Sequence, residues 1–236
     1  MAELTEQIAI VTGAGRGIGE AISKRLAALG ATVVLVARDT ARLAQVKSEI
    51  ENAGGRAETA SVDLLHEGAI DTLAGFIKVR HGRCDILVNN AGIGAMGKPL
   101  HETAPGIWDA VMATNLRAPF LMIRALAPLM IAASRGHIIN ISSLAGHNPL
   151  RNGAAYAASK WGLNGLTYSV AEELRDFGIR VSAVAPGSVH TEFGGSGADG
   201  SWKIQPEDVA NIVAMIVTQS PHSFVSEVLV RPARKR

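Results

Sequence analysis

A tyrosine and a lysine stand four positions apart in a segment with a helical pattern. Tyr156 and Lys160 would share one face of that helix, because residues four apart are neighbours on a helix surface. A free tyrosine has a pKa of about 10 and is a poor base at neutral pH, but a neighbouring ammonium group favours the phenolate. The pair could therefore donate or accept a proton. Taken alone, this spacing is common, and a solvated helix pair is the ordinary explanation.

Polar residues at the ends of two expected strands favour a catalytic role for this pair. Ser142 and Ser143 follow the strand expected at 137–141, and Asn89–Gly92 ends the strand before it. Ligands bind at the carboxyl ends of parallel strands, where a serine hydroxyl can donate to a substrate carbonyl oxygen. Asn115 interrupts an apolar helical segment, and a buried asparagine needs hydrogen-bond partners. A satisfied core asparagine is the ordinary explanation for that single position.

A glycine-rich turn, Thr12–Gly19 (TGAGRGIG), joins the first expected strand to a helix. Glycines let the backbone approach a pyrophosphate, and a helix N-terminus supplies free N–H groups and partial positive charge. The turn therefore predicts a dinucleotide phosphate site, with a structural strand-to-helix turn as the alternative. The spacing is not G-x-G-x-x-G, because Ile18 occupies the position of the third glycine.

The end of the second expected strand should lie near the adenosine ribose. An acidic side chain there suits a 2′-hydroxyl, whereas an arginine suits a 2′-phosphate. Ala37 and Arg38 stand at this position, Asp39 is one residue too far along, and Arg16 in the glycine turn adds a second positive charge. Guanidinium groups pair well with phosphate, so the arginines favour NADP(H) over NAD(H). Two ordinary surface arginines are the alternative.

Strand and helix patterns alternate along the chain. Strands are expected at 7–11, 32–37, 57–62, 85–89, 137–141, 179–185 and 225–230, and helices at 18–29, 40–53, 66–80, 103–133, 154–176 and 206–219. Several strands are apolar at consecutive positions, as strands covered on both faces should be. The alternation predicts an α/β fold with a doubly wound parallel sheet and helices on both faces. No composition break divides the chain, so 1–236 is expected to form one domain.

Composition excludes several other classes of protein. Of the 236 residues, 47% are apolar and 19% are charged, which is typical of a globular domain. The net charge is +2 and four basic residues lie among the last six, so no nucleic-acid-binding face is expected. The histidines lack metal-ligand spacing, and the single cysteine excludes an intrachain disulfide. With no signal-like N-terminus and no long apolar stretch, the expected location is cytoplasmic, without a membrane partner.

Together these motifs resemble the short-chain dehydrogenase/reductase family in its single-domain form. The resemblance runs from Thr12 to Thr191 and includes the T-G-x-x-x-G-x-G turn, N-N-A-G at Asn89–Gly92, and the tyrosine–lysine pair. It implies a Rossmann fold with seven strands in the order 3-2-1-4-5-6-7. It also implies hydride transfer between NADP(H) and a small-molecule carbonyl or alcohol, with no metal, and a homo-oligomer that is a tetramer or a dimer.

The resemblance also assigns roles to particular residues. The catalytic positions would be Asn115, Ser143, Tyr156 and Lys160; Ser143 is preferred to Ser142 because it lies thirteen residues before Tyr156, as in the family. Tyr156 would give a proton to the substrate oxygen, and Ser143 would hydrogen-bond that oxygen. Lys160 would lower the tyrosine pKa and hold the nicotinamide ribose, while Asn115 would support a water that connects the lysine to solvent.

The cofactor-binding positions implied by the family motifs extend over most of the chain. Asp63 would lie near the adenine, and the segment after the sixth strand would hold the nicotinamide carboxamide. The full set is Gly13, Arg16, Gly17, Ile18, Gly19, Arg38, Asp63, Leu64, Asn90, Ala91, Gly92, Pro186, Gly187, Val189 and Thr191, together with Tyr156 and Lys160.

The sequence is nearest to the 3-oxoacyl-[acyl-carrier-protein] reductase branch of the family, which makes a 3-oxoacyl thioester one candidate substrate. Two departures weaken that assignment. The segment between Thr191 and Pro206 is short and glycine-rich, so 194–203 is expected to form a shortened substrate lid. Relatives that use a carrier protein tend to have basic residues before the fifth strand, and a docking patch is less evident in Ile131–Arg135. The alternatives are an NAD(P)-dependent alcohol dehydrogenase for another small substrate and a non-catalytic NADP(H)-sensing scaffold.

Two further residues lie near the expected substrate site. His147 follows Ser143 by four residues and could face the substrate, although an ordinary loop histidine explains it as well. Trp202, in the expected lid, could cover the pocket or simply anchor the loop.

Overall fold

Apolar strands alternate with helices in the computed structural model, which describes residues 3–193, 200–220 and 222–234. The strands are β1 (Ile8–Thr12), β2 (Thr32–Ala37), β3 (Arg56–Ser61), β4 (Ile86–Asn89), β5 (Gly136–Ile141), β6 (Ile179–Pro186) and β7 (Glu227–Val230). The α-helices are α1 (Gly17–Ala28), α2 (Thr40–Asn52), α3 (Glu67–His81), α4 (Pro105–Met112), α5 (Ala118–Ala133), α6 (Ala154–Arg175) and α7 (Pro206–Val217). Each strand begins and ends within two residues of its expected position.

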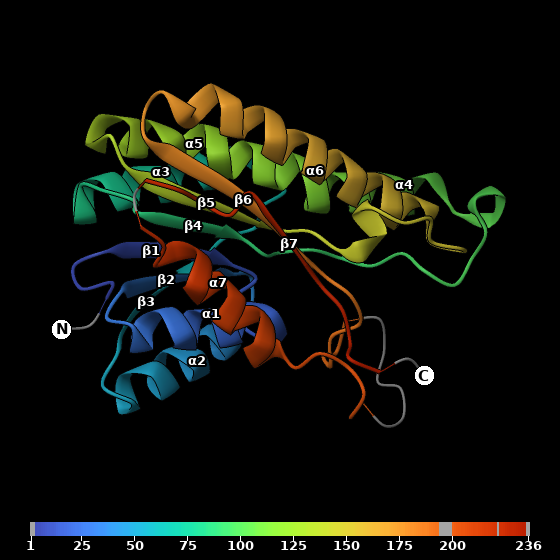
Figure 1. The fold of residues 1–236 in the computed structure, drawn as a ribbon, viewed down its shortest axis with the longest axis horizontal. Coiled ribbons are helices and arrows are strands. Elements are labelled where there is room, and N and C mark those ends of the chain that lie inside the picture. Colours follow the sequence, from blue (N-terminus) through green and yellow to red (C-terminus); the bar gives the residue numbers. More distant parts are fainter. Residues whose placement is uncertain (1–2, 194–199, 221, 235–236) are drawn as a thin grey trace.

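The strands form one parallel sheet in the order β3-β2-β1-β4-β5-β6-β7 (Figure 1). All six neighbouring pairs are parallel, so both the sheet and its strand order are confirmed. The strand order reverses between β1 and β4, which we call the switch point. Open α/β sheets bind ligands beyond the carboxyl ends of the strands at such a point.

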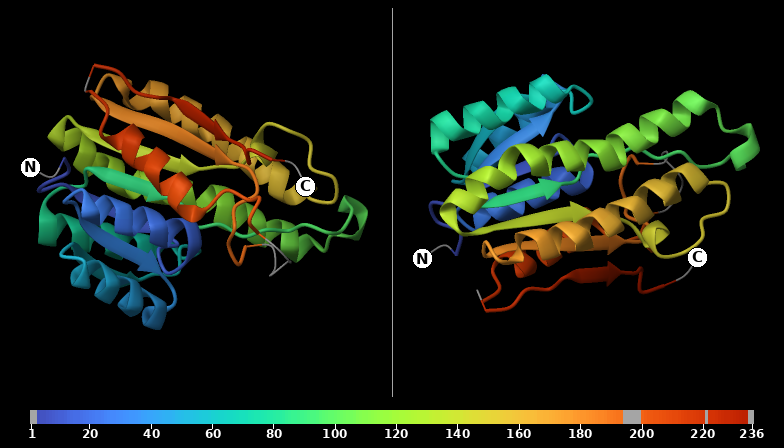
Figure 2. Two further views of the ribbon diagram at one scale, coloured as in Figure 1. Left: turned by 60° about the horizontal axis from the view of Figure 1, so that its bottom comes forward. Right: turned by 90° about the horizontal axis from the view of Figure 1, so that it is seen from above.

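Helices cover both faces of the sheet, and each layer has its own hydrophobic core (Figures 1 and 2). One core lies between the sheet and α1, α2 and α7, and includes Val11 and Leu26. The other lies between the sheet and α3, α5 and α6, and includes Ile10 and Leu126. Successive strand residues point to opposite faces, so the neighbours Ile10 and Val11 enter different cores. This explains why the strands are apolar at consecutive positions.

The helix expected at 103–133 is divided in the structure. A π-helical segment, η2 (Ala113–Arg117), joins α4 to α5, with Asn115 at its centre. A π segment widens the helix locally and is frequent at functional sites. Asn115 is fully buried there. The pattern of apolar residues cannot reveal such a segment. Because this helical stretch is apolar almost throughout, a local change in the number of residues per turn leaves the pattern apolar.

Helical residues Pro105–Ala133 are long and apolar enough to cross a membrane by length and composition alone. In this fold, however, many apolar side chains of α5 are buried inside the protein. Leu121, Met122, Leu126 and Met130 are buried in the second core, and α5 packs against α3. The hydropathy of this segment is therefore explained by its place against the sheet.

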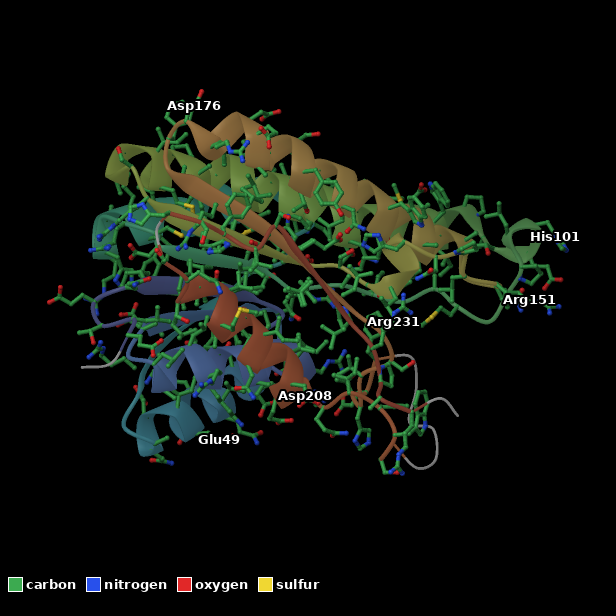
Figure 3. All side chains as sticks on the ribbon, in the orientation of Figure 1. Glu49, His101, Arg151, Asp176, Asp208 and Arg231 are labelled. Carbon is green, nitrogen blue, oxygen red and sulfur yellow. The ribbon has the colours of Figure 1, made fainter. Side chains whose placement is uncertain are left out.

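The carboxyl ends of the strands lie at the end of the molecule where α4 and the start of α6 extend beyond the sheet (Figure 2). Figure 3 places His101 and Arg151 at this end, and Asp176, just after α6, at the opposite end. Tyr156 and Lys160 lie in the first turns of α6, so they belong to the end at which the strands terminate.

Candidate active site

Hydrogen bonds from Thr12 and Asn90 join the two sides of the switch point. The Thr12 hydroxyl accepts from the backbone N–H groups of Asn90 and Ala91, at 3.0 and 3.1 Å, and donates to the Val88 carbonyl at 3.3 Å. The Asn90 side-chain amide donates to the carbonyls of Thr12 and Gly13, at 2.9 and 3.3 Å. The glycine turn and the end of β4 are thereby held in one relative position.

The glycine turn approaches its neighbours so closely that side chains would not fit. Gly13 and Gly17 have φ values of 65° and 57°, a left-handed conformation that side chains disfavour. A Cβ on Gly19 would meet the carbonyl oxygen of Gly13, and one on Gly17 would lie 3.2 Å from Thr191 Cγ2. Because α1 begins at Gly17, its free N–H groups lie beside this turn. The turn therefore fits a pyrophosphate group.

Three arginines lie around the glycine turn and the end of β2. Arg38 is exposed, and its side chain has no ion pair within the part of the chain that the structure describes. Arg16 Nη1 lies 2.7 Å from Glu192 Oε2, and Arg42 Nη1 lies 3.3 Å from the same oxygen. A Cβ on Gly15 would lie 3.2 Å from Arg42 Cβ, so Arg42 stands against the turn. Arg42 was not among the sequence-predicted residues, although its place four residues after Arg38 was a usable signal.

Acidic residues near the expected adenosine site accept hydrogen bonds from backbone N–H groups two or three residues along the chain. Asp39 caps α2, and its Oδ1 accepts from the backbone N–H of Arg42 at 3.1 Å. Asp63 follows β3, and its Oδ1 accepts from the N–H of Leu65 at 3.1 Å. Leu64 is half-buried against the second core. The Asp39 carboxylate thus caps the N-terminus of α2. Asp63 and Leu64 lie at the carboxyl end of the sheet, where an adenine is expected.

The segment after β6 lies beside the glycine turn. Pro186 is the last residue of β6, and the Gly187 N–H donates to the Val230 carbonyl at 2.8 Å. Val189 pairs with Ile204 in an isolated parallel bridge. Two residues later, Thr191 contacts the glycine turn as described above. The expected carboxamide-binding segment and the expected pyrophosphate turn are therefore adjacent in space.

Tyr156 and Lys160 lie on one face of α6, and both are buried. Lys160 Nζ lies 5.8 Å from the centre of the Tyr156 ring and donates to the Ile141 carbonyl at 2.8 Å. Since Ile141 ends β5, the ammonium group is held at the carboxyl end of the sheet. A Cβ on Gly92 would lie 3.8 Å from Lys160 Nζ, so the end of β4 is also close to the lysine.

Burial governs the protonation of both side chains. It lowers the pKa of Lys160 to about 8, because the ammonium group loses hydration. Burial also raises the pKa of Tyr156, and a hydrogen bond with the Ser143 side chain partly offsets that rise. Burial and the Ser143 hydrogen bond account for this shift, and the expected lowering of the tyrosine pKa by Lys160 stays a prediction. Tyr156 is a phenol at neutral pH, which is the form that can donate a proton.

The two serines after β5 have different partners. Ser143 is hydrogen-bonded to Tyr156, and its Oγ also accepts from the N–H of Ala145 at 3.1 Å. The Ser142 hydroxyl instead donates to Asn164 Oδ1 at 2.6 Å. Ser143, rather than Ser142, thus stands beside the tyrosine, while Ser142 fixes the start of this turn to α6.

Asn115 connects the segment after β4 to the helix that carries Tyr156. Its Oδ1 accepts from the Ile93 N–H at 2.8 Å, and its Nδ2 donates to the Ile93 carbonyl at 2.9 Å and to Ser159 Oγ at 3.0 Å. Ser159 in turn donates to the Tyr156 carbonyl at 2.7 Å. Protein groups thus provide hydrogen-bond partners for both side-chain atoms of Asn115, as expected for a core asparagine. Its expected role in supporting a water stays a prediction.

An apolar wall covers Tyr156. The Phe193 ring lies 5.9 Å from the Tyr156 ring, centre to centre. A Cβ on Gly94 would lie 3.2 Å from Met96 Cε and 3.3 Å from Phe193 Cε1, so these two side chains meet there. Phe193 was not among the sequence-predicted residues. Its place two residues after Thr191, at the entry to the expected lid, was the available signal.

The remaining candidates are only partly described. Residues 194–199 of the expected lid, 194–203, lie outside the described residues. Trp202 is half-buried, and its Nε1 has no hydrogen-bond partner in the described chain. His147 Nε2 lies 2.7 Å from Glu227 Oε1 and 3.0 Å from Asn164 Nδ2. The His147 imidazole therefore contacts the side chains of Glu227 and Asn164.

The chain belongs to the short-chain dehydrogenase family, because that family's model, described as short chain dehydrogenase, matches residues 7–200. An uncharacterized oxidoreductase of Staphylococcus saprophyticus is 37% identical, over 98% of this chain and 100% of the relative. A metagenomic short-chain oxidoreductase solved in complex with NADP is 56% identical, with a TM-score of 0.89 and coverage of 99% and 100%. An alcohol dehydrogenase from Thermococcus sibiricus, complexed with 5-hydroxy-NADP, is 26% identical, with a TM-score of 0.91 and 98% coverage of both chains.

The link across the switch point predicts a stability effect. Thr12→Val keeps the side-chain shape but removes the acceptor of two backbone N–H groups. We expect the free energy of unfolding to fall by about 1–2 kcal/mol, the lower part of the usual cost of unsatisfied buried donors, because the two N–H groups are only partly buried. Urea denaturation measures it. Thr72→Val, which alters an exposed hydroxyl on α3, is the matched control and should change stability by less than about 0.5 kcal/mol. Equal losses in the two variants would contradict the role given to Thr12.

Proposed function

We propose that this chain is an NADP(H)-dependent oxidoreductase that reduces a ketone or aldehyde to an alcohol. The observation that carries the proposal is the buried pair of Tyr156 and Lys160, with Ser143 hydrogen-bonded to the tyrosine, at the carboxyl end of the sheet. Membership of the short-chain dehydrogenase family supports it. So does the NADP complex of the relative that is 56% identical.

The residues around the switch point suit this cofactor. Gly13, Gly17 and Gly19 allow the tight turn at the start of α1, whose free N–H groups suit a pyrophosphate. Arg16 and Arg38 supply positive charge for a 2′-phosphate. Lys160 would hold the nicotinamide ribose, and Asp63 with Leu64 would lie at the adenine. The segment Pro186–Thr191 would contact the carboxamide.

Side chains of the protein then supply the proton that the reduction requires. Bound NADPH supplies a hydride to the carbonyl carbon. The Tyr156 hydroxyl donates its proton to the substrate oxygen, and the Ser143 hydroxyl holds that oxygen in place. The Lys160 ammonium group stabilises the negative charge left on the tyrosine oxygen. In the opposite direction, the same tyrosine would accept a proton from an alcohol.

The wall beside Tyr156 favours an apolar substrate. Phe193 and Met96 present no charged group to the reacting end of the site. A 3-oxoacyl thioester is the narrower candidate, supported by the nearest sequence branch. A panel of ketones, aldehydes and 3-oxoacyl thioesters, followed by loss of NADPH absorbance, separates it from other carbonyl compounds. Activity only with an alcohol and NADP⁺ would favour the alcohol dehydrogenase alternative, and no turnover at all would favour the sensing scaffold.

Exposed aromatic side chains support a homo-oligomer, a dimer or a tetramer. Trp108, Phe120, Trp161 and Tyr168 lie on α4, α5 and α6 and are each more than a third exposed. Large exposed apolar side chains on neighbouring helices are typical of a protein interface. Sedimentation velocity measures the subunit number.

Removing the tyrosine hydroxyl tests the catalytic assignment. We expect Tyr156→Phe to lower kcat by at least about 10²-fold, because the proton donor is lost, while the Kd for NADPH changes only a few-fold. Steady-state kinetics and NADPH fluorescence measure the two effects. Tyr168→Phe is the control, since that hydroxyl hydrogen-bonds to Glu227. It should keep its turnover, and comparable activity in Tyr156→Phe would refute the assignment.

Reversing the charge at the end of β2 tests the cofactor preference. Arg38→Asp should lower kcat/KM for NADPH by about 10- to 100-fold, the loss expected for a charge-assisted hydrogen bond, and should affect NADH far less. Steady-state kinetics with each cofactor measures the ratio. Arg175→Asp, at the far end of α6, should leave it unchanged. An unaltered ratio in Arg38→Asp would contradict the 2′-phosphate assignment.

The lowered pKa of Lys160 predicts the pH dependence of reduction. Below about pH 8 the lysine is protonated and can stabilise the tyrosine oxygen, whereas above that pH it becomes neutral. Tyr156, whose pKa is raised, stays protonated through this range. We expect kcat/KM for NADPH, which reports the free enzyme, to be level below about pH 8 and to fall above it. A profile that rises through pH 8 would contradict this order of titration.

A further inference from the structure

Three consecutive residues, Thr191–Phe193, link the glycine turn to the tyrosine. Thr191 contacts Gly17 of the turn, and Phe193 lies over the Tyr156 ring. Between them, Glu192 extends to the arginines at the expected adenosine end. This short segment therefore contacts both ends of the proposed cofactor site.

The Glu192 carboxylate bridges two of these arginines. Its Oε2 lies 2.7 Å from Arg16 Nη1 and 3.3 Å from Arg42 Nη1. The two guanidinium groups hold the pKa of Glu192 below its usual range, so the carboxylate is ionised at neutral pH. The Arg16 and Glu192 side chains are 64% and 63% exposed, so a solute anion can reach the same arginines.

These arginines surround the place where a 2′-phosphate is expected. Arg42 lies in the first turn of α2, four residues after Arg38, and its Cβ lies against Gly15 of the glycine turn. Carboxylates and phosphates bind guanidinium groups through the same kind of charge-assisted hydrogen bond. A phosphate and the Glu192 carboxylate would repel each other if both occupied these donors. The two anions would therefore compete for these donors.

We propose that Glu192 is a cofactor-specificity residue whose carboxylate competes with the 2′-phosphate of NADP(H) for Arg16 and Arg42. Arg42 is then a third ligand of that phosphate, beside Arg16 and Arg38. NAD(H) has no 2′-phosphate and binds without releasing Glu192 from the arginines. Glu192 thus reduces the preference for NADP(H) that the arginines create. The inference rests on the proposed function, which places the 2′-phosphate at Arg16 and Arg38.

Isothermal titration calorimetry on the whole chain tests this competition without turnover. The probes are NADP⁺, NAD⁺ and adenosine 2′,5′-bisphosphate, which carries the 2′-phosphate without the nicotinamide. Glu192→Gln should lower the Kd for NADP⁺ and for the bisphosphate by about two- to fivefold, the range for exposed ion pairs, and leave the Kd for NAD⁺ unchanged. An unchanged or weaker Kd for NADP⁺, or an equal gain for NAD⁺, would overturn the proposal.

Glu172→Gln is the matched control for the removed charge. Glu172 is an exposed carboxylate paired with Arg175 in the last turn of α6, next to Asp176 at the opposite end of the molecule (Figure 3). Its substitution should leave all three dissociation constants unchanged. An equal gain in NADP⁺ affinity in this variant would attribute the effect to net charge and overturn the specific role of Glu192.

Arg42 is tested in the variant that already lacks the competing carboxylate. Adding Arg42→Gln to Glu192→Gln should weaken binding of NADP⁺ and of the bisphosphate, and leave that of NAD⁺ unchanged. Unchanged NADP⁺ binding would remove Arg42 from the phosphate site. Equal Kd values for NADP⁺ and NAD⁺ in the wild type would instead refute the proposed cofactor preference. A wild type that prefers NADP⁺, with no gain in Glu192→Gln, refutes only the competition.

Discussion

The fixed position of β1 relative to β4 is the constraint on which the candidate site depends. The Thr12 hydroxyl and the Asn90 side chain hold the glycine turn against the end of β4. The contact is close: Gly13 has a positive φ, and a Cβ at Gly13 would lie 2.9 Å from Asn90 Nδ2. If this contact were looser, the glycine turn and the residues after β4 would lose their fixed relative position. A cofactor that touches both sides would then lack a defined site.

From this contact, a series of polar links reaches α6, the helix that carries Tyr156 and Lys160. The segment after β4 is held by Asn115 through the Ile93 backbone, and Asn115 also hydrogen-bonds to Ser159. Ser159 lies in α6 between Tyr156 and Lys160 and donates to the Tyr156 carbonyl. The π segment places the Asn115 side chain where it can make both contacts. The proposed proton-handling residues are thus positioned relative to the glycine turn by buried hydrogen bonds as well as by the sheet.

Sequence patterns predicted the sheet well, because neighbours such as Ile10 and Val11 are both apolar and enter opposite cores. They also indicated Tyr156 and Lys160, whose spacing follows helix geometry directly. They did not predict the π segment, because it changes the pitch of an already apolar helix. Arg42, Glu192 and Phe193 were missed because their roles depend on contacts between distant segments. The direction of the Tyr156 pKa shift also required a structure, since it follows from the burial of that side chain.

The central claim is that this site transfers a hydride directly from NADPH to a carbonyl carbon while Tyr156 supplies the proton. The most direct measurement uses NADPH deuterated at the transferable position of the nicotinamide ring, with a ketone that the chain reduces, and mass spectrometry of the alcohol. The account predicts one deuterium on the carbinol carbon of the product, for each NADPH oxidised, in ordinary water. Alcohol without deuterium at that carbon, or NADPH oxidation without alcohol, would contradict it.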